Sequence, residues 1–228
     1  MHLMSDRSNQ PAFECPGCYI QQYPRGRSIM RLLGIHGSPR KGGNSDLLLE
    51  RALQGARDAG AEVSELTARG LKLEGCRECG GCDETGECVV DDEMQRVYGL
   101  LKEADAVIVA TPIFFYTVPA QLKAVIDRCQ APWNSRKLSR PREQWKNYSG
   151  GCGYLIAVGA TRGARLFESV ELVARYFFDA LDMSYQGAVL CRGADEKGAV
   201  AGQTETLQKA YELGRRAAQG KDLDGITT

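Results

Sequence analysis

Apolar residues recur in two alternating patterns along this chain from residue 30 onward. Short runs that are continuously apolar predict strands buried on both faces of a sheet, and apolar residues three or four apart predict amphipathic helices. The predicted strands are residues 30–35, 62–66, 106–110, 154–158 and 185–190. The predicted helices run from Asp46 to about Ala59, from Asp91 or Asp92 to Leu101, from Pro119 to Cys129, from Ala164 to Leu181 and from about Glu205 to Gln219.

Strand and helix alternate along the whole of this region, which indicates an α/β fold. The pattern is typical of a doubly wound parallel five-stranded sheet with helices on both faces. We expect the flavodoxin-like strand order 2-1-3-4-5, which places the ligand-binding edge between the first and third strands. The domain is expected to span residues 30–220. Residues 1–29 are polar and contain prolines, so they predict an extension outside the core, and residues 221–228 predict a C-terminal tail.

Composition narrows the class of protein. The chain has 228 residues, enough for one α/β domain with a full core, and 29 basic residues balance 29 acidic ones. This balance gives no reason to expect nucleic acid or an anionic membrane as a partner. No apolar run approaches the roughly 20 residues of a membrane span, and no signal-peptide pattern begins the chain. Nine cysteines, an odd number, favour free or metal-bound thiols and therefore a cytoplasmic location.

Four of the cysteines lie close together in the loop predicted at residues 75–90. They are Cys76, Cys79, Cys82 and Cys88, with the spacing C-x2-C-x2-C-x5-C. Three thiolates in regular steps can close over one face of a cubic iron–sulfur cluster while a fourth completes it, so [4Fe–4S] is the first assignment. Zinc is the main alternative, and redox or inert thiols remain open. A disulfide framework is disfavoured in a chain of this size without secretory features.

A glycine-rich loop at residues 37–45 follows the first predicted strand and leads into a helix. Free amides and the positive dipole end of a helix favour a phosphate. The predicted binding residues here are Ser38, Arg40, Gly43, Asn44 and Ser45. Neither G-x-G-x-x-G nor a Walker lysine motif is present, which disfavours a dinucleotide fingerprint and a nucleoside triphosphatase. The alternative is a glycine-rich turn that only caps the helix.

An aromatic loop at residues 112–118 follows the third predicted strand. It exposes more apolar surface than a loop normally does, and a flat isoalloxazine ring would cover it. The predicted contacts are Pro112, Ile113, Phe114, Phe115 and Tyr116, together with Thr161 from the loop after the fourth strand. The two loops together predict flavin mononucleotide (FMN) as cofactor. Packing of the aromatic loop against a partner subunit is the alternative.

Taken together, these motifs resemble the iron–sulfur flavoproteins within the NADPH-dependent FMN reductase superfamily. The resemblance rests on residues 37–45, the four cysteines, residues 91–94 and residues 111–128, and it runs from about Met30 to the last helix. It implies a flavodoxin-like fold, noncovalently bound FMN and a [4Fe–4S] cluster on the four cysteines. It also implies a homodimer or homotetramer, in which the cluster of one subunit faces the flavin of another. Superfamily members that lack some of these cysteines act as plain flavin or quinone reductases.

The pairing of cofactors predicts the activity. A flavin takes electrons in pairs or singly, whereas a cluster passes them singly. We therefore expect an FMN-dependent oxidoreductase that transfers electrons between a donor, ferredoxin or NAD(P)H, and a small-molecule acceptor. One alternative is an NAD(P)H-dependent flavin or quinone reductase whose cysteine loop is structural or binds zinc. Another is a non-enzymatic flavodoxin-like electron carrier. No acid–base residue is demanded; Tyr116 is either a donor to a substrate oxygen or a packed ring.

Further residues carry weaker signals. Cys15 and Cys18 form a C-x2-C pair in the extension and are either idle thiols, ligands of a shared metal or a redox dithiol. His36 is expected to make a structural hydrogen bond. Three cysteines in or beside apolar elements are expected in the core: Cys129, Cys152 and Cys191. The basic segment from Arg136 to Lys146 is interpreted as a solvated loop, or as a surface that steers an acidic ferredoxin or the phosphate of NADPH.

Overall fold

A parallel β-sheet forms the centre of the molecule, and the computed structural model describes it within residues 29–221. Its strands are β1 (Arg31–His36), β2 (Glu62–Thr67), β3 (Ala106–Pro112), β4 (Gly151–Gly159) and β5 (Met183–Arg192). Their order is β2-β1-β3-β4-β5, and every neighbouring pair is parallel. The predicted five-stranded sheet and its order are confirmed. The predicted extension, including Cys15 and Cys18, lies outside the described residues, as does the tail beyond residue 221.

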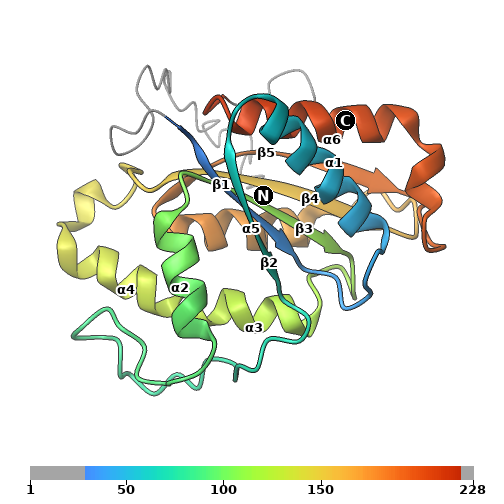
Figure 1. Cartoon of the computed structure of the whole chain (residues 1–228). Helices are drawn as coiled ribbons and strands as arrows, with labels where there is room; N and C mark the ends of the chain where they lie inside the picture. Colours follow the sequence, from blue (N-terminus) through green and yellow to red (C-terminus); the bar gives the residue numbers. More distant parts are fainter. Residues whose placement is uncertain (1–28, 222–228) are drawn as a thin grey trace, which may run out of the picture.

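Helices cover both faces of the sheet (Figure 1). One face packs against α1 (Asn44–Asp58) and α6 (Thr204–Ala217), and the other against α2 (Met94–Glu103), α3 (Ala120–Arg128) and α5 (Glu168–Ala180). A further helix, α4 (Gln130–Ser139), follows α3. Short 3₁₀ turns occupy Arg142–Gln144 and Ala199–Gly202. The sheet is thus buried on both sides, as its continuously apolar strands predict.

Close contacts between backbones explain why glycine occupies two positions in the core. A Cβ at Gly214 would lie 1.7 Å from the carbonyl oxygen of Ala52, because α1 and α6 cross there with their backbones nearly in contact. A Cβ at Gly151 would lie 2.1 Å from the carbonyl oxygen of Asp105, and Gly151 has φ +123°. Only glycine combines that backbone conformation with so close an approach. Both positions fix how neighbouring elements meet around the apolar core.

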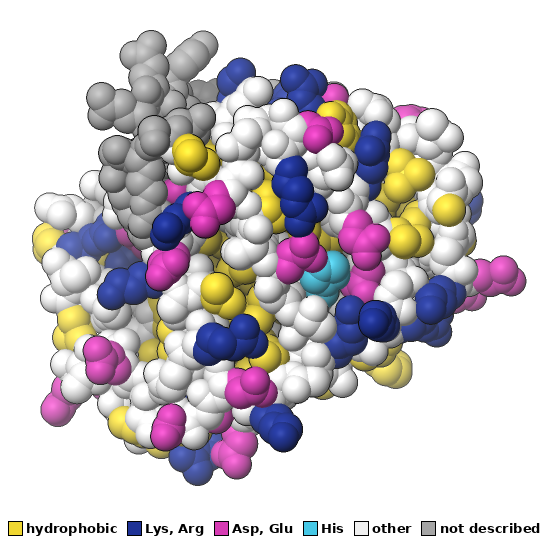
Figure 2. All heavy atoms as spheres, in the orientation of Figure 1, with side chains coloured by type: hydrophobic (Ala, Val, Ile, Leu, Met, Phe, Trp, Pro, Cys, Tyr) yellow, Lys and Arg dark blue, Asp and Glu magenta, His cyan; other side chains and the backbone are white. Residues whose placement is uncertain are grey.

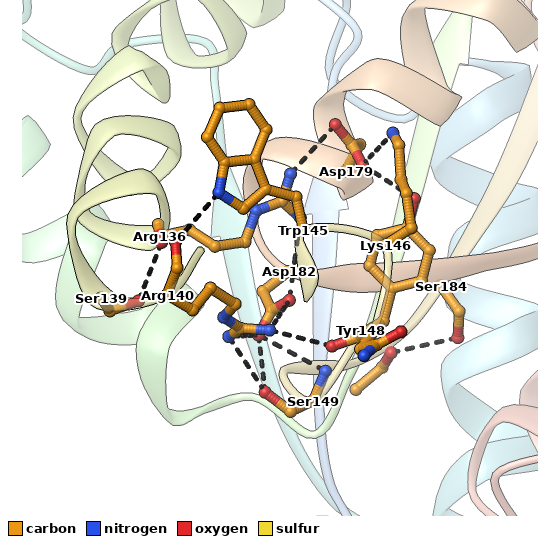
Figure 3. A network of polar contacts seen from close by, with 12 residues as sticks. Arg136, Ser139, Arg140, Trp145, Lys146, Tyr148, Ser149, Asp179, Asp182 and Ser184 are labelled. Atoms are coloured by element: carbon orange, nitrogen blue, oxygen red, sulfur yellow. Dashed lines mark hydrogen bonds and ion pairs between the residues drawn. The ribbon is translucent and has the colours of Figure 1, made fainter. Parts of the chain in front are cut away.

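Two predictions from the sequence are wrong in part: the one for the basic segment and the one for the start of helix α5. The basic segment begins in helix α4 instead of a loop, and Arg136 is buried with 3% of its side chain exposed. Its charge is compensated by Asp179 at 3.1 Å and Asp182 at 3.7 Å, at the end of α5 and just after it (Figure 3). Lys137, Arg142 and Lys146 are exposed, as a solvated segment predicts. Helix α5 begins at Glu168 instead of Ala164, because turns occupy residues 164–167.

The distribution of charge on the surface and the burial of three cysteines agree with the predictions from the sequence. Basic and acidic side chains are interspersed over the face shown in Figure 2, as expected for a chain whose charges balance. Cys129, Cys152 and Cys191 are buried, which confirms their prediction as core residues. Across residues 29–221, none of the helices is both long enough and apolar enough to span a membrane.

Candidate functional site: a pocket at the sheet edge and a clamped cysteine loop

A pocket of about 370 Å³ opens at the carboxyl edge of the sheet, where β1 and β3 end side by side. This is the switch point at which open α/β sheets bind ligands. The pocket brings together eight of the predicted cofactor residues, namely Ser38, Arg40, Gly43, Asn44, Ser45, Pro112, Ile113 and Phe114. It is also lined by Ala160, from the predicted loop after the fourth strand, and by Val158, Ala194 and Asp195, which the sequence interpretation missed. The carboxyl ends of β4 and β5 meet the same edge, so strand order alone could have indicated these residues.

The loop of residues 37–45 supplies the polar end of this pocket. Its start is tied to the sheet by the amide of Gly37, which donates to the carbonyl oxygen of Ala110 at 2.7 Å. Helix α1 begins at Asn44 with no side-chain cap, so its first amides are available to a ligand. The hydroxyl of Ser45 is buried, with 2% of the residue exposed, and has no hydrogen-bond partner within the described part of the chain. A buried, unsatisfied hydroxyl beside free amides fits a phosphate group.

Asn44 lines the pocket, but its side chain binds the backbone of the segment after β5. Its side-chain amide donates to the carbonyl oxygens of Ala194 at 3.1 Å and Glu196 at 2.8 Å. Its side-chain oxygen accepts from the amide of Val200 at 3.4 Å. The side chain therefore holds the segment after β5 against the loop of residues 37–45. The side chain of Lys197 also reaches this loop, because a Cβ at Gly42 would lie 3.7 Å from its Cε.

A buried carboxylate supports the loop from below. Asp46 accepts hydrogen bonds from the amide of Gly42 at 2.9 Å and from His36 at 3.1 Å, and Arg69 lies 3.0 Å away. Burial alone would raise the pKa of Asp46, but these donors outweigh it and lower that pKa. His36 also contacts Glu65 at 3.0 Å, which confirms its structural hydrogen bonding. The carboxylate is thus neutralised by cations and leaves the adjacent helix terminus attractive to an anion.

The aromatic loop forms a tight turn at the other end of the pocket. Phe114 and Thr117 exchange two backbone hydrogen bonds of 2.8 and 2.9 Å. Between them Phe115 and Tyr116 have φ of +49° and +64°, a left-handed conformation that costs non-glycine residues about 1–2 kcal/mol each. Phe115 is fully exposed and Tyr116 is 54% exposed. These two residues and Thr161 do not line the pocket, so their predicted contact with a flavin stays a prediction.

The cysteine loop connects β2 to α2 and carries four free thiols. Cys76 and Cys79 are exposed, whereas Cys82 and Cys88 are partly buried. The amide of Asn134 on α4 donates to the sulfur of Cys82 at 3.2 Å. Gly86 packs against the same helix, where a Cβ would lie 2.5 Å from the Cα of Ser135. Within residues 29–221 no three potential ligands among His, Cys, Asp and Glu are gathered closely enough to hold a metal ion.

A buried ion pair clamps the two stems of this loop together. Arg128, with 1% of its side chain exposed, donates to both carboxylate oxygens of Asp92, at 2.7 and 3.1 Å. It also donates to the carbonyl oxygen of Glu74 at 2.9 Å, just before the first cysteine. Asp92 in turn accepts from the amides of Glu74 at 3.1 Å and Met94 at 3.0 Å. The sequence indicated Asp91 or Asp92 at the start of this helix, but not the pairing of Asp92 with Arg128, because Arg128 is distant in the chain.

Comparison with known proteins places the chain in a family. Residues 30–193 match the family described as NADPH-dependent FMN reductase. The chain belongs to this family. As a member of the NADPH-dependent FMN reductase family, it is an FMN-dependent oxidoreductase, and the prediction of FMN as its cofactor is confirmed, while the two loops as its binding site stay a prediction. The flavodoxin-like fold is the one its structural relatives share.

Several relatives bear the name iron-sulfur flavoprotein, and two of them show the extent of the similarity. One, from Archaeoglobus fulgidus, is 34% identical over 83% of this chain and 80% of its own length. The other, from Methanosarcina thermophila, is 33% identical over 63% of this chain and 71% of its own length. Among solved structures, an NAD(P)H:quinone oxidoreductase from Methanothermobacter marburgensis has a TM-score of 0.64 at 15% identity, covering 83% of this chain and 97% of its own. A flavone reductase has a TM-score of 0.62 at 19% identity, with 86% of this chain and 65% of its own length covered.

Proposed function

We propose that this family member is an FMN- and [4Fe–4S]-containing oxidoreductase that transfers electrons between a carrier, ferredoxin or NAD(P)H, and a small acceptor. The single observation behind the cluster is a loop of four cysteines whose stems are clamped by Arg128 and Asp92. A set of four thiolates, the first three in regular steps along the chain, suits an iron–sulfur cluster. The names of the two iron-sulfur flavoproteins support the same assignment.

The pocket at the sheet edge is proposed as the FMN site. The amides at the start of α1 and the hydroxyl of Ser45 would hold the phosphate, with Arg40 supplying positive charge. Pro112, Ile113 and Phe114 would border the ring. The bound flavin supplies electron transfer in pairs or singly. The chain's own part is to fix the phosphate, exclude water from the apolar walls and keep Asp46 neutralised beneath the loop.

The cysteine loop is proposed as the cluster site. Cys76, Cys79, Cys82 and Cys88 would be the ligands, and the cluster supplies single-electron transfer. The amide of Asn134 already donates to the sulfur of Cys82, and such a bond stabilises a thiolate and tunes the potential of a cluster. The exposed positions of Cys76 and Cys79 require their part of the loop to close when metal binds.

Metal analysis of protein purified without oxygen tests the cluster. We expect about four irons per chain and a broad visible absorbance beneath the flavin bands. The variant Cys79→Ala should lose iron but keep FMN, whereas Cys191→Ala, which changes a buried thiol far from the loop, should keep both. Stoichiometric zinc with no iron would overturn the cluster assignment.

Ser45→Ala tests the FMN site. Its hydroxyl has no partner within the described residues, so the variant should fold as well as the wild type and bind FMN about tenfold more weakly. Ser64→Ala, at an exposed position on β2, is the matched control. Flavin fluorescence titration of the apoprotein measures both affinities. Equal affinities for the two variants would contradict the assignment of the phosphate to this loop.

A second candidate function follows from the positions of the four cysteines, which are not gathered closely enough in the described part of the chain to hold a metal ion. If the loop is structural or binds zinc, the protein is an NAD(P)H-dependent flavin or quinone reductase. Rapid NADPH oxidation with a quinone by iron-free protein would favour it. Reduction by ferredoxin with turnover of a small acceptor favours the first proposal, and reduction without turnover of any acceptor favours a simple electron carrier. We also propose that the protein is cytoplasmic and forms a homodimer or homotetramer. Sedimentation of the purified protein would check the oligomeric state.

A further inference from the structure

A buried asparagine connects helix α4 to the cysteine loop. Asn134 lies on α4, and 2% of the residue is exposed. Its side-chain nitrogen Nδ2 donates to the sulfur of Cys82 at 3.2 Å and to a carboxylate oxygen of Asp83 at 2.8 Å, so each of its two hydrogens has an acceptor. Within residues 29–221, Cys82 is the one cysteine of this loop whose sulfur receives a hydrogen bond.

Charged neighbours fix the orientation of this side-chain amide. The carboxylate of Asp83 can only accept hydrogen bonds, so it faces the nitrogen of Asn134. On the other side, the ammonium group of Lys137 can only donate, and it lies 3.4 Å from Oδ1 of Asn134. Turning the amide over would place oxygen against carboxylate and nitrogen against ammonium. Asn134 therefore presents a donor, and not an acceptor, to Cys82.

The loop is held against α4 at this point by contacts that need no metal (Figure 1). A Cβ at Gly86 would lie 2.5 Å from the Cα of Ser135, so the two backbones are packed closely. The amide of Gly86 donates to the carbonyl oxygen of Cys82 at 2.9 Å. The first two cysteines of the loop are exposed instead. Closure around a metal would move the exposed part and leave the contact between Asn134 and Cys82 in place.

A donor at a cysteine sulfur has a defined effect on a metal cluster. Negative charge on the sulfurs increases when the cluster gains an electron, so a hydrogen bond to sulfur stabilises the reduced form more than the oxidised form. We propose that Asn134 is a positioning residue that raises the midpoint potential of the [4Fe–4S] cluster through Cys82. The inference rests on the proposed function, and it adds the residue that sets the potential and the direction of its effect.

Two charged groups flank Asn134 and act in opposite directions. The negative charge of Asp83 would lower the potential, and the positive charge of Lys137 would raise it. Both residues are exposed, so water and salt screen their charges. The amide of Asn134 is shielded from water, where a hydrogen bond is stronger. We therefore expect the hydrogen bond to exceed the combined effect of the two charges.

Asn134→Leu tests the proposal, because leucine has a similar shape and no donor. Wild type and variant are purified without oxygen and titrated with dithionite, and electron paramagnetic resonance of the reduced cluster gives the midpoint potential. At a fixed potential the ratio of reduced to oxidised cluster should fall at least threefold, a shift of about 28 mV for one electron. The iron content and the midpoint potential of FMN should stay unchanged.

Ser139→Ala is the matched control. Ser139 is exposed on the same helix, and its hydroxyl donates to the carbonyl oxygen of Arg136. Its loss should leave the cluster potential unchanged. A fall in Ser139→Ala as large as that in Asn134→Leu would overturn the proposal, because the effect would then belong to the helix and not to the hydrogen bond.

A second measurement needs no variant. Holoprotein labelled with ¹⁵N in its asparagine side chains should show a ¹⁵N coupling in pulsed electron paramagnetic resonance spectra of the reduced cluster. The coupling is expected because Nδ2 of Asn134 lies 3.2 Å from the sulfur of Cys82. It should disappear in Asn134→Leu, which assigns it to this residue.

The outcomes separate this inference from the proposed function. A lowered potential in Asn134→Leu at unchanged iron content, together with the ¹⁵N coupling, supports the inference. Equal potentials in wild type and Asn134→Leu, or no ¹⁵N coupling in the wild type, overturn it and leave the cluster assignment intact. If the variant loses its iron, the ¹⁵N coupling of the wild type decides. Wild-type protein without iron would overturn the proposed cluster and this inference together.

Discussion

The ion pair that joins the stems of the cysteine loop allows its contribution to the free energy of unfolding to be predicted. The test replaces one carboxylate oxygen of Asp92. Asp92 accepts four hydrogen bonds with two carboxylate oxygens: each oxygen receives one backbone amide and one nitrogen of Arg128. Asp92→Asn keeps the shape but replaces one acceptor oxygen with a donor, so one amide and one guanidinium nitrogen lose their acceptor. The charge of Arg128 is also left uncompensated. A neutral hydrogen bond contributes about 1 kcal/mol and a charged one about 2 kcal/mol, which gives a loss of about 3 kcal/mol.

Urea unfolding of the holoprotein, followed by circular dichroism, measures this loss as a shift of the midpoint at an unchanged slope. Asp91→Asn is the matched control, because it removes the same charge from an exposed neighbour and should change stability by no more than about 0.5 kcal/mol. If Asp92→Asn unfolds at the same urea concentration as Asp91→Asn, the clamp does not stabilise the fold and the reasoning is refuted.

The same pair predicts a dependence on pH. Burial favours a raised pKa for Asp92, but the hydrogen bonds from Arg128 and from the amides of Met94 and Glu74 lower it below its usual value. A lowered folded pKa stabilises the protein above the unfolded pKa, near 3.9, and the stabilisation is lost as pH falls through the folded value. The stability difference between wild type and Asp92→Asn should therefore be constant from about pH 5 to 7 and shrink below about pH 4.

Two more predictions concern the helices and the loop support. Hydrogen bonding to Asp46 raises the pKa of His36, so its stabilisation is present below the unfolded pKa of about 6.5 and lost as pH rises through the folded value. Thermal unfolding from pH 6 to 9 should show this loss of stability in wild type but not in His36→Gln. Gly214→Ala should destabilise the protein by about 3 kcal/mol or more, because its Cβ would clash with a backbone oxygen, whereas Gly99→Ala, in open space on α2, should stabilise it by about 1 kcal/mol. Equal melting temperatures for the two alanine variants would contradict the packing at the helix crossing.

The fold was predictable from the sequence because the central strands can be recognised from their own apolar residues, without knowing which strands they pair with. Residues 106–110 are continuously apolar, and the structure buries all of them within β3. The glycine-rich turn before α1 was predictable for a similar reason, since glycines followed by a helical pattern are a local signal; its phosphate-binding role stays a proposal. Pocket residues such as Ala194 carry no local signal of a binding role, so only the predicted strand order could have pointed to them.

Helix α4 shows what the sequence could not supply. Arg136 belongs to a polar segment and has no local feature that predicts burial. Its carboxylate partners, Asp179 and Asp182, lie more than forty residues further along the chain, so only the folded arrangement compensates its charge. Buried charge depends on long-range pairing in this way, whereas apolar periodicity is a local signal.

The clamp has a consequence for the life of the protein in the cell. Arg128 and Asp92 join the loop stems with protein groups alone, so the stems stay together whether or not metal is bound. In small zinc domains, by contrast, metal binding and folding are one event, and removal of the metal unfolds the chain. Here the entropic cost of joining the stems is met during folding, and only the part of the loop that carries Cys76 and Cys79 remains to be ordered by a metal. If the protein holds the proposed cluster, we expect that a cluster destroyed by oxygen can be rebuilt on the folded protein, which makes such damage repairable instead of a route to degradation.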